Sequence, residues 1–497
     1  MEGKWVVHIC PCRCSNFHYV QLFWLLTWFC FINPSWVFAI EIHPLDKASL
    51  FQFKSQLNDP TRNLATWVGS NCSNWVGVVC ERQMGRVISI NLGHLNLSGS
   101  ISNSLCRVSF LEELDVSHNC ISSVVPPCIG RLLSLRRLDL GHNDLRGSVP
   151  DTFMGLKNMR ELVLGGNQHL GGDLPSWIGN FSTSLEKLDL GRNAFRGEMP
   201  ESLFHSVSLR YLDLSWNNLS GCLGEFHQPL LVLNLSSNRI SGSLPCFVAS
   251  MQSLSILNMA NNSIAGGIPS CISSLQALTQ LNLSSNELGY QISPAVVFSE
   301  KLLVLDLSFN QLSGPLPDKI AELTDKSGLV ILDLSHNQFS GEIPRRIMEL
   351  QRLLALFLSH NSLVGEIPDG IGNLTYLQVI DLSHNALTGT IPMNIGACFQ
   401  LLALILNNNN LSGEIHPELD ALDTLLILDI SGNKISGEIP LTLAGWKSLE
   451  VVDISSNNLS GPLADAMAKW SNLRYLSLAG NRFGGSIPDW LFKFPAM

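Results

Sequence analysis

The chain has 497 residues, a net charge of −10, 14% charged residues and 45% hydrophobic residues. It contains no basic run, which argues against nucleic acids and anionic membrane surfaces as partners. Its hydrophobic residues recur periodically, which excludes a disordered chain.

Residues 1–39 are predicted to be a secretory signal peptide. A mildly basic start is followed by an almost wholly apolar stretch over residues 20–32, which is the layout of such a peptide. Pro34 interrupts the stretch, which favours a cleaved signal over a membrane anchor, and we expect cleavage after Ala39. No second stretch of about twenty apolar residues follows. The sequence therefore predicts entry into the secretory pathway.

Residues 40–86 are predicted to form an N-terminal cap domain. Apolar residues recur at roughly helical spacing between Leu45 and Leu57, and Asp46 is placed to act as the N-cap of this helix. We expect the apolar side of the helix to cover the first coil of the array that follows.

From residue 87 to residue 497, asparagines recur at a near-constant step. Thirteen of the sixteen steps are 24 residues long, and the other three are 26, 21 and 27. A fixed period in this range is typical of a solenoid. Leu95 stands where the first asparagine is expected, and the others are Asn119, Asn143, Asn167, Asn193, Asn217, Asn238, Asn262, Asn286, Asn310, Asn337, Asn361, Asn385, Asn409, Asn433, Asn457 and Asn481.

Each asparagine belongs to the frame L-x-x-L-x-L-x-x-N-x-L, as in the run from Leu377 to Leu387. The L-x-L part predicts a short strand whose side chains alternate between core and solvent. One coil cannot bury its own apolar residues, so consecutive coils stack and share a core. The asparagine amide can bond backbone groups that the bend after the strand leaves free. We therefore predict an α/β-type solenoid of about 17 repeats with an asparagine ladder.

A second motif, G-x-I-P, follows many frames, as at Gly365–Pro368 and Gly389–Pro392. Glycine permits a turn that other residues resist, and proline fixes the chain where no N–H donor is needed. The combination resembles the plant extracellular type of leucine-rich repeat, which implies a right-handed superhelix.

The concave face of such a solenoid is its free surface, so its outward positions are candidate binding residues for a ligand or a partner protein. Early repeats place charged or aromatic residues there, and arginine, tyrosine and tryptophan are common binding hot spots. Later repeats place apolar residues there, and contiguous exposed apolar residues mark interaction sites. The candidates are Arg136, Arg160, Glu161, Lys187, Arg192, Arg210, Tyr211, Trp216, Leu303, Phe309 and Phe357. The alternative is ordinary solvated surface.

Glycosylation acceptors of the form N-x-S/T are dense, which suggests a glycoprotein if the chain is secreted. Some arise because N-N-L-S is part of the repeat. The acceptors are Asn71, Asn96, Asn180, Asn218, Asn234, Asn261, Asn282, Asn373, Asn410 and Asn458.

Cysteine spacing suggests bonds between neighbouring coils. Cys246 and Cys271 lie 25 residues apart, so stacking at about 4.8 Å would bring them within disulfide range. Cys106 and Cys128 lie 22 residues apart, and this spacing suggests a disulfide less strongly. Free thiols are the alternative for both pairs of cysteines.

No catalytic, metal-binding or cofactor-binding constellation is found in the sequence. Histidines recur just before the ladder asparagine, as at His336, His360 and His384. We interpret them as residues of an exposed variable position, with a metal row or a pH sensor as the alternative. The sequence predicts no enzyme and no cofactor.

Several runs resemble kinase-less plant receptor-like proteins of the CLAVATA type. These runs are Asp46–Leu50, Cys72–Trp75, Tyr376–Gly389, Cys398–Leu404, Leu411–Leu422 and Lys469–Leu478. The resemblance implies that Cys72 and Cys80 form a disulfide in the cap. It also implies a plasma-membrane, non-catalytic co-receptor that acts in peptide-hormone signalling during meristem maintenance. Its ligands would be secreted peptides of the CLE type, and its partner a receptor kinase or pseudokinase.

The sequence departs from that family in its C-terminal part, where no terminal cap or membrane anchor precedes Met497. We expect a truncated gene model, with a short secreted form as the alternative. Peptide-reading receptor kinases tend to carry an R-x-R pair on a concave strand, whereas Arg136 and Arg137 are adjacent here. Two other functions remain open: a secreted inhibitor of cell-wall-degrading enzymes and an immune receptor-like protein.

Overall fold

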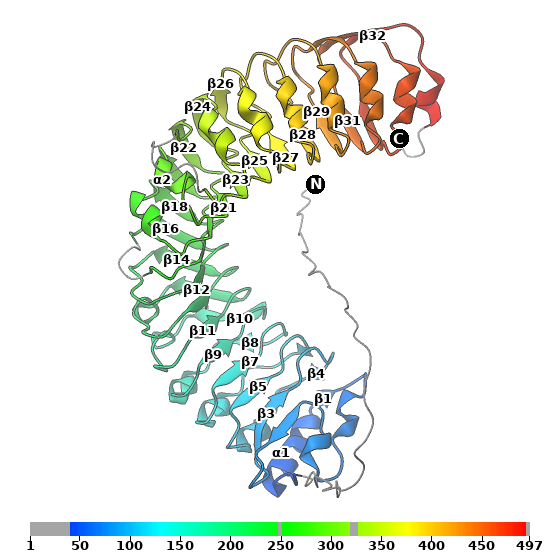
Figure 1. Cartoon of the computed structure of the whole chain (residues 1–497). Coiled ribbons are helices and arrows are strands. Elements are labelled where there is room, and N and C mark those ends of the chain that lie inside the picture. The colour runs from blue at the N-terminus through cyan, green and yellow to red at the C-terminus, as the bar shows by residue number, and fades with distance from the viewer. Residues whose placement is uncertain (1–39, 247–250, 319–326, 494–497) are drawn as a thin grey trace, which may run out of the picture. The chain divides into compact units, whose positions relative to one another are not determined.

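The computed structural model describes residues 40–246, 251–318 and 327–493. The predicted signal peptide, residues 1–39, lies outside the described residues. Within them, the chain from Ile40 onward forms one continuous stack of coils (Figure 1). No described helix combines enough length and apolarity to cross a bilayer.

The inner side of the stack is a single sheet with one short strand from each coil (Figure 1). Its neighbouring strands are parallel, except that β2 pairs antiparallel with β3 at the N-terminal edge. The strands, in spatial order, are β2 (Val78–Cys80), β3 (Val87–Asn91), β5 (Glu113–Asp115), β7 (Arg137–Asp139), β9 (Glu161–Val163), β11 (Lys187–Asp189), β13 (Tyr211–Asp213), β15 (Val232–Asn234), β17 (Ile256–Asn258), β19 (Gln280–Asn282), β21 (Val304–Asp306), β23 (Ile331–Asp333), β25 (Ala355–Phe357), β27 (Val379–Asp381), β28 (Ala403–Ile405), β29 (Ile427–Asp429), β31 (Val451–Asp453) and β33 (Tyr475–Ser477).

A second set of parallel strands follows the ladder asparagines, around the Ser-Gly part of the repeat. Gly389 shows why glycine recurs there: its φ is +76°, and a Cβ would lie 2.7 Å from Cγ of Glu366 in the preceding coil. The main sheet of this set comprises β8 (Arg146–Gly147), β10 (His169–Asp173), β12 (Ala194–Glu198), β14 (Asn218–Cys222), β16 (Arg239–Ser243), β18 (Ser263–Gly266), β20 (Glu287–Tyr290), β22 (Gln311–Pro315), β24 (Gln338–Glu342) and β26 (Ser362–Val364). Two smaller sheets continue this set. In one, β4 (Ser98–Gly99) pairs parallel with β6 (Cys120–Ile121) and antiparallel with β1 (Leu57–Asn58) of the cap; the other consists of the parallel strands β30 (Ser436–Glu438), β32 (Asn458–Pro462) and β34 (Arg482–Gly484).

Short 3₁₀ helices complete most coils on the side away from the inner sheet. A proline precedes many of them in an extended conformation, as Pro368 does before η10 (Asp369–Asn373). Proline cannot donate an N–H, and that donor would be unused at a helix start. The I-P step of the sequence motif therefore marks the entry into each of these helices.

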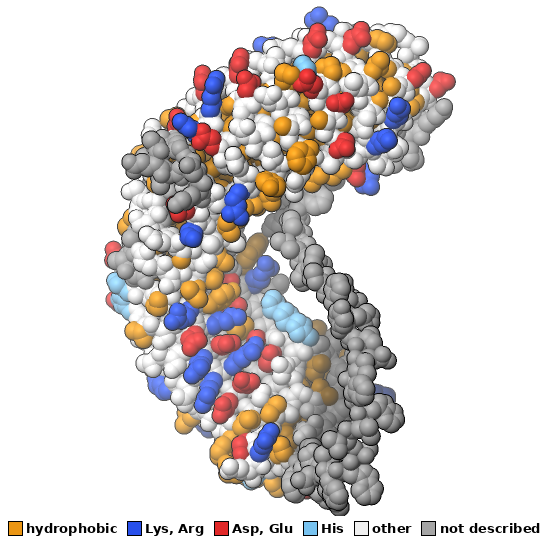
Figure 2. Space-filling view, viewed as in Figure 1, with side chains coloured by type: hydrophobic (Ala, Val, Ile, Leu, Met, Phe, Trp, Pro, Cys, Tyr) orange, Lys and Arg blue, Asp and Glu red, His pale blue; other side chains and the backbone are white. Residues whose placement is uncertain are grey.

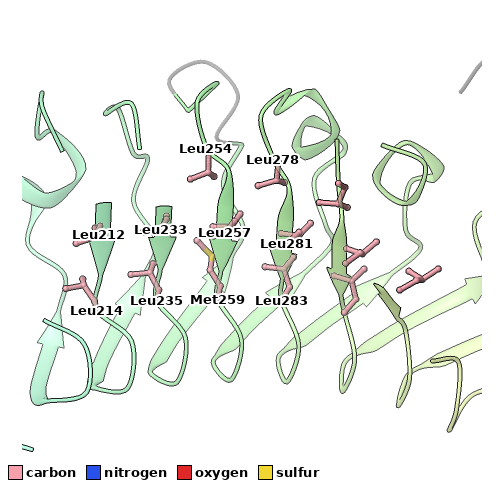
Figure 3. Close-up of a cluster of buried hydrophobic side chains, with 14 of the residues drawn as sticks. Leu212, Leu214, Leu233, Leu235, Leu254, Leu257, Met259, Leu278, Leu281 and Leu283 are labelled. Atoms are coloured by element: carbon pink, nitrogen blue, oxygen red, sulfur yellow. The ribbon is translucent and has the colours of Figure 1, made fainter. Parts of the chain in front are cut away.

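The core is a set of leucine columns that run through the stack. Figure 3 shows one stretch, in which Leu212 and Leu214 align with Leu233 and Leu235, and these with Leu257 and Met259. All six side chains are fully buried. Burying one such side chain stabilises the fold by about 1.5–3 kcal/mol. Because each column continues into the next coil, no coil forms a core of its own, as the frame predicts.

The ladder asparagines are confirmed as inward-pointing residues that bond two coils at once. Nδ2 of Asn286 donates to the carbonyl oxygen of Met259 in the preceding coil at 2.9 Å, and to those of Leu283 and Ser284 in its own turn at 3.0 and 3.2 Å. Its Oδ1 accepts from the N–H of Ile264 at 3.0 Å. The same pattern recurs from Asn119 to Asn481.

The cap begins with α1 (Pro44–Lys54), whose Leu50 and Phe53 are fully buried. Ser104 of η3 (Asn103–Arg107), in the first coil, donates to the carbonyl oxygen of Ser49 at 3.0 Å. The helix therefore covers the first coil as predicted. The prediction that Asp46 is its N-cap is wrong.

His43 occupies the N-cap position instead, and its Nδ1 accepts from the N–H of Leu45 at 3.3 Å. Asp46 lies inside the first turn of α1 with no exposed surface. Its carboxylate accepts from Nε and Nη2 of Arg86, both at 2.9 Å, and from the N–H of Val87 at 2.9 Å. A buried ion pair thus fastens the cap to the first strand of the array.

Disulfides join Cys72 to Cys80 in the cap, and Cys106 to Cys128 and Cys246 to Cys271 between neighbouring coils. Cys398, which replaces a core leucine, is buried, and burial raises the pKa of its thiol to about 11. It is a small apolar residue of the core rather than a reactive thiol.

Replacing Cys72 by serine is expected to destabilise the cap by about 2–3 kcal/mol, because the unfolded chain then loses the short loop that the disulfide closes. Secreted yield and thermal melting measure the effect. Cys222→Ser is the matched control, since Cys222 is exposed and forms no disulfide among the described residues. Equal yield and melting for the two variants would contradict the prediction.

Candidate functional site

The candidate site is the exposed face of the inner sheet, which three columns of side chains line. The residue just before each strand belongs to the first column, and the first residue of the strand belongs to the second. At β21 these residues are Leu303 and Val304. The third lies at the end of the strand, where Asp306 stands. Residues of neighbouring coils in one column are paired Cα to Cα, as Asp306 is with Asp333.

A charged section covers β5 to β13, where Figure 2 shows alternating blue and red side chains. Nη2 of Arg137 lies 3.7 Å from Oδ2 of Asp115 and 3.6 Å from Oδ2 of Asp139, and its Nε lies 3.5 Å from Oε2 of Glu161. Nε of Arg136 lies 3.6 Å from Oε2 of Glu112. Two cations of the section, Arg136 and Arg137, are therefore paired with carboxylates of their own and neighbouring coils.

Aromatic residues contribute to the same section. Nζ of Lys187 lies 5.0 Å from the ring centroid of Tyr211, and the guanidinium of Arg192 lies 5.5 Å from that of Trp216, both within cation–π range. Burial and the nearby carboxylate of Asp213 raise the pKa of Tyr211 to about 12. Arg160 and Arg210 are exposed in the same column as Arg136.

An acidic–apolar section covers β21 to β29. Its column residues are four aspartates, Gln378 and thirteen apolar residues, and no lysine or arginine stands at any of these positions. The section comprises Leu303, Val304, Asp306, Val330, Ile331, Asp333, Leu354, Ala355, Phe357, Gln378, Val379, Asp381, Leu402, Ala403, Ile405, Leu426, Ile427 and Asp429. Phe309, which is 54% exposed, lies at its N-terminal border.

Sequence reasoning missed the aspartate and asparagine column at the strand ends and treated these positions as freely variable. Each side chain holds the following turn: Oδ1 of Asp333 accepts from the N–H and Oγ of Ser335 at 3.0 and 2.7 Å. Asn282 makes the same bonds to Ser284 at 2.9 and 2.7 Å. The recurring D-x-S of the frame was the available signal.

Stacking the carboxylates raises their pKa values. Burial, together with the neighbouring charge of Asp213, raises the pKa of Asp189 to about 6. Burial likewise raises the pKa of Asp333 to about 6, although its bonds to Ser335 oppose the shift. Burial also raises the pKa of Asp139 and of Asp429.

These shifts predict that the contribution of Asp189 and Asp333 to stability falls as pH rises from about 4 to 7. An unfolded aspartate has a pKa of about 3.9, so between that pH and about 6 the folded state binds more protons than the unfolded state, which makes folding less favourable as pH increases. Urea unfolding at pH 4.5 and pH 7 measures this. In a variant with Asp189→Asn and Asp333→Asn, the free energy of unfolding is expected to depend less on pH. An unchanged pH dependence would contradict the raised pKa values of these two aspartates.

The recurrent histidines form two stacked rows at the turn after the strands. Ring centroids are 4.1 Å apart for His336 and His360 and 4.0 Å apart for His360 and His384, and Phe309 stacks on His336 at 3.9 Å. These positions have positive φ, +51° at His336 and +53° at His360. Burial, followed by repulsion from neighbouring histidines, lowers the pKa of both. Parallel rings direct their nitrogens side by side, which does not suit a shared metal ion.

The predicted glycosylation acceptors divide by position. Asn180, Asn261 and Asn373 are exposed, whereas Asn234 and Asn282 stand on inner strands between the two sections. Nδ2 of Asn234, the atom that would carry the sugar, donates to Oδ2 of Asp213 at 3.0 Å.

Models of the leucine rich repeat match residues 109–168, 184–206, 205–221, 229–251, 253–275, 301–323, 328–350, 352–374, 376–398 and 423–483. The model of the leucine rich repeat N-terminal domain matches residues 43–81. Together these matches cover more than half of the chain.

The chain is 61% identical to the receptor-like protein CLAVATA2 of Arabidopsis thaliana over 213 residues, which are 43% of this chain and 30% of that relative. The match thus spans less than a third of that relative's length.

Two solved plant ectodomains show similar folds. The Arabidopsis receptor kinase HAESA, solved with the peptide hormone IDA and the co-receptor SERK1, is 28% identical with a TM-score of 0.68, over 92% of this chain and 89% of that chain. The ectodomain of the Arabidopsis receptor kinase GASSHO1/SCHENGEN3, solved with CASPARIAN STRIP INTEGRITY FACTOR 2, is 30% identical with a TM-score of 0.64, over 89% and 62%. The chain belongs to the leucine-rich-repeat family and is similar, within it, to plant receptor-like proteins such as CLAVATA2.

Proposed function

We propose that this chain is the extracellular recognition domain of a plant receptor-like protein, which binds a secreted peptide on its inner sheet and acts with a receptor kinase. The observation that carries the proposal is the inner sheet itself: a charged section and an acidic–apolar section lie exposed on one continuous surface. The similarity to CLAVATA2 and to two peptide-bound ectodomains supports it. The role is recognition rather than catalysis.

The finer parts of the proposal come from the sequence resemblance. They are a peptide of the CLE type, a kinase or pseudokinase partner at the plasma membrane, and a role in meristem maintenance. The contact residues proposed are Arg136, Arg160, Glu161, Lys187, Arg192, Arg210, Tyr211, Trp216, Leu303, Phe309 and Phe357, which lie in the two sections or border them.

Calorimetry with the secreted, purified chain tests the proposal. Synthetic CLE-type peptides are titrated, with scrambled peptides of equal composition as controls. We expect saturable binding of at least one peptide, and a loss of more than tenfold in affinity when either Arg160 and Arg210 or Phe309 and Phe357 are replaced by aspartate. Recruitment of a receptor-kinase ectodomain is measured in the same preparation. Absence of both peptide binding and kinase recruitment would refute the proposal.

A further inference from the structure

The four carboxylates of the acidic–apolar section face the free surface without a counter-ion. Within the described part of the chain, Asp306, Asp333, Asp381 and Asp429 form no ion pair. Their Oδ1 atoms hold the turns through Ser308, Ser335, Ser383 and Ser431. The Oδ2 atoms accept no hydrogen bond from described residues, unlike Oδ2 of Asp213, which is bonded to Asn234. Each aspartate therefore retains an acceptor for a ligand.

Apolar side chains surround this acceptor column on the same face. Phe357 and Ile405 take the place of aspartate in two of the six strands, and Leu402 is 36% exposed in the neighbouring column. The other apolar side chains of the section are half-buried or, for Ala355 and Ala403, buried. A contiguous apolar strip that water still reaches marks an interaction surface. A small inorganic cation would neutralise the carboxylates but leave the apolar strip in water.

The charged section provides the contrast. There Arg136 and Arg137 already pair with carboxylates of three successive coils. A ligand charge would compete with these pairs, whereas in the acidic–apolar section a positive ligand charge would meet no competitor. The predicted acceptors Asn234 and Asn282 lie outside the section, so a sugar at either would not be attached within it.

From this charge complementarity we infer that the acidic–apolar section binds an extended peptide that carries both cationic and apolar side chains. Five steps of about 4.8 Å separate β21 from β29, which gives roughly 24 Å, or about seven residues of extended chain at about 3.3 Å each. The lysine or arginine side chains bind the free Oδ2 atoms, and the apolar side chains pack on Phe357, Leu402 and Ile405. The inference rests on the proposed function and specifies the ligand class and its place.

Fluorescence anisotropy with three labelled nine-residue probes tests the inference on the secreted chain. The probes alternate pairs of leucines with pairs of arginines, pairs of glycines with pairs of arginines, and pairs of leucines with pairs of glutamates, so that each face of the extended probe carries both kinds of side chain. We expect the leucine–arginine probe to bind at least tenfold more tightly than either other probe, with an affinity that falls as salt increases.

The variant Asp333→Asn, Asp381→Asn, Asp429→Asn should weaken the leucine–arginine probe by more than tenfold. Each change creates an N-x-S acceptor, so the native chain and all variants are produced in a secretion host that lacks N-glycosylation. Asparagine preserves the turn, since Asn282 makes the same bonds in the native chain. Asp189→Asn with Asp213→Asn in the charged section is the matched control and should change affinity by less than twofold. Leu402→Asn should weaken the probe while leaving its salt dependence intact.

The inference would be overturned if the leucine–glutamate probe bound as tightly as the leucine–arginine probe. It would also be overturned if the triple variant bound the leucine–arginine probe as tightly as the native chain does. Neither result would contradict the proposed function, which is tested separately by the binding of CLE-type peptides and the recruitment of a receptor kinase. Binding of those peptides that is lost only in the charged-section variant would place the ligand elsewhere on the sheet.

Discussion

Replacing Asp46 by alanine is expected to destabilise the cap by about 3–5 kcal/mol, because the change leaves the charge of Arg86 in a largely buried place without its partner. The side chain of Arg86 is 13% exposed and that of Asp46 fully buried. The N–H of Val87, at the start of β3, loses its acceptor as well. Hydrogen exchange of α1 and β3, together with urea unfolding, measures the effect.

The partner variants distinguish a lost ion pair from lost packing. Arg86→Met alone should also be strongly destabilising, because it leaves the fully buried carboxylate of Asp46 without its counter-ion. A double variant with leucine at 46 and methionine at 86 should recover much of the stability, since apolar residues of similar volume often replace a buried pair at little cost. If the double variant is no more stable than Asp46→Ala, the pair is not the source of the loss.

The parts of the fold that repetition specifies could be predicted from the sequence. Asn385 is one of sixteen residues in the same frame, so its inward position followed from the period. The bonds of Nδ2 to the carbonyl oxygens of Leu358, Leu382 and Ser383 are those that the free backbone of the bend requires. The role of Asp46 could not be predicted in this way, because its partner Arg86 lies 40 residues away in a segment outside the repeat.

The candidate site was only partly predictable for a related reason. The exposed positions of residues such as Arg160 and Phe309 follow from the repeat frame alone. The pairing of Arg137 with three carboxylates, by contrast, depends on the distances between stacked coils. The raised pKa of Asp333 depends on burial and on Asp306 in the preceding coil. The positive φ at His336 is a property of the turn rather than of the residue type: histidine is enriched in the left-handed region, but Arg192 and Phe309 adopt it at the same position of other coils.

Replacing Asn286 by alanine is expected to cost about 3 kcal/mol, at the upper end of the usual range for buried polar groups left unpaired. Alanine removes three donated bonds and one accepted bond, and the groups left without a partner belong to two coils. Asn286 is buried, so water cannot readily replace these bonds. Urea unfolding should show a lower midpoint and, because coupling between the coils on either side weakens, a broader or split transition.

The matched control is Asn472→Ala. Asn472 is exposed and donates one bond, to the carbonyl oxygen of Lys447 at 3.0 Å, and water can take over that bond at a cost below about 1 kcal/mol. The comparison separates the ladder from the general effect of losing an asparagine side chain. A single sharp transition with an unchanged midpoint in Asn286→Ala would mean that stacked leucines alone hold the coils together, and that the ladder only orients the turns.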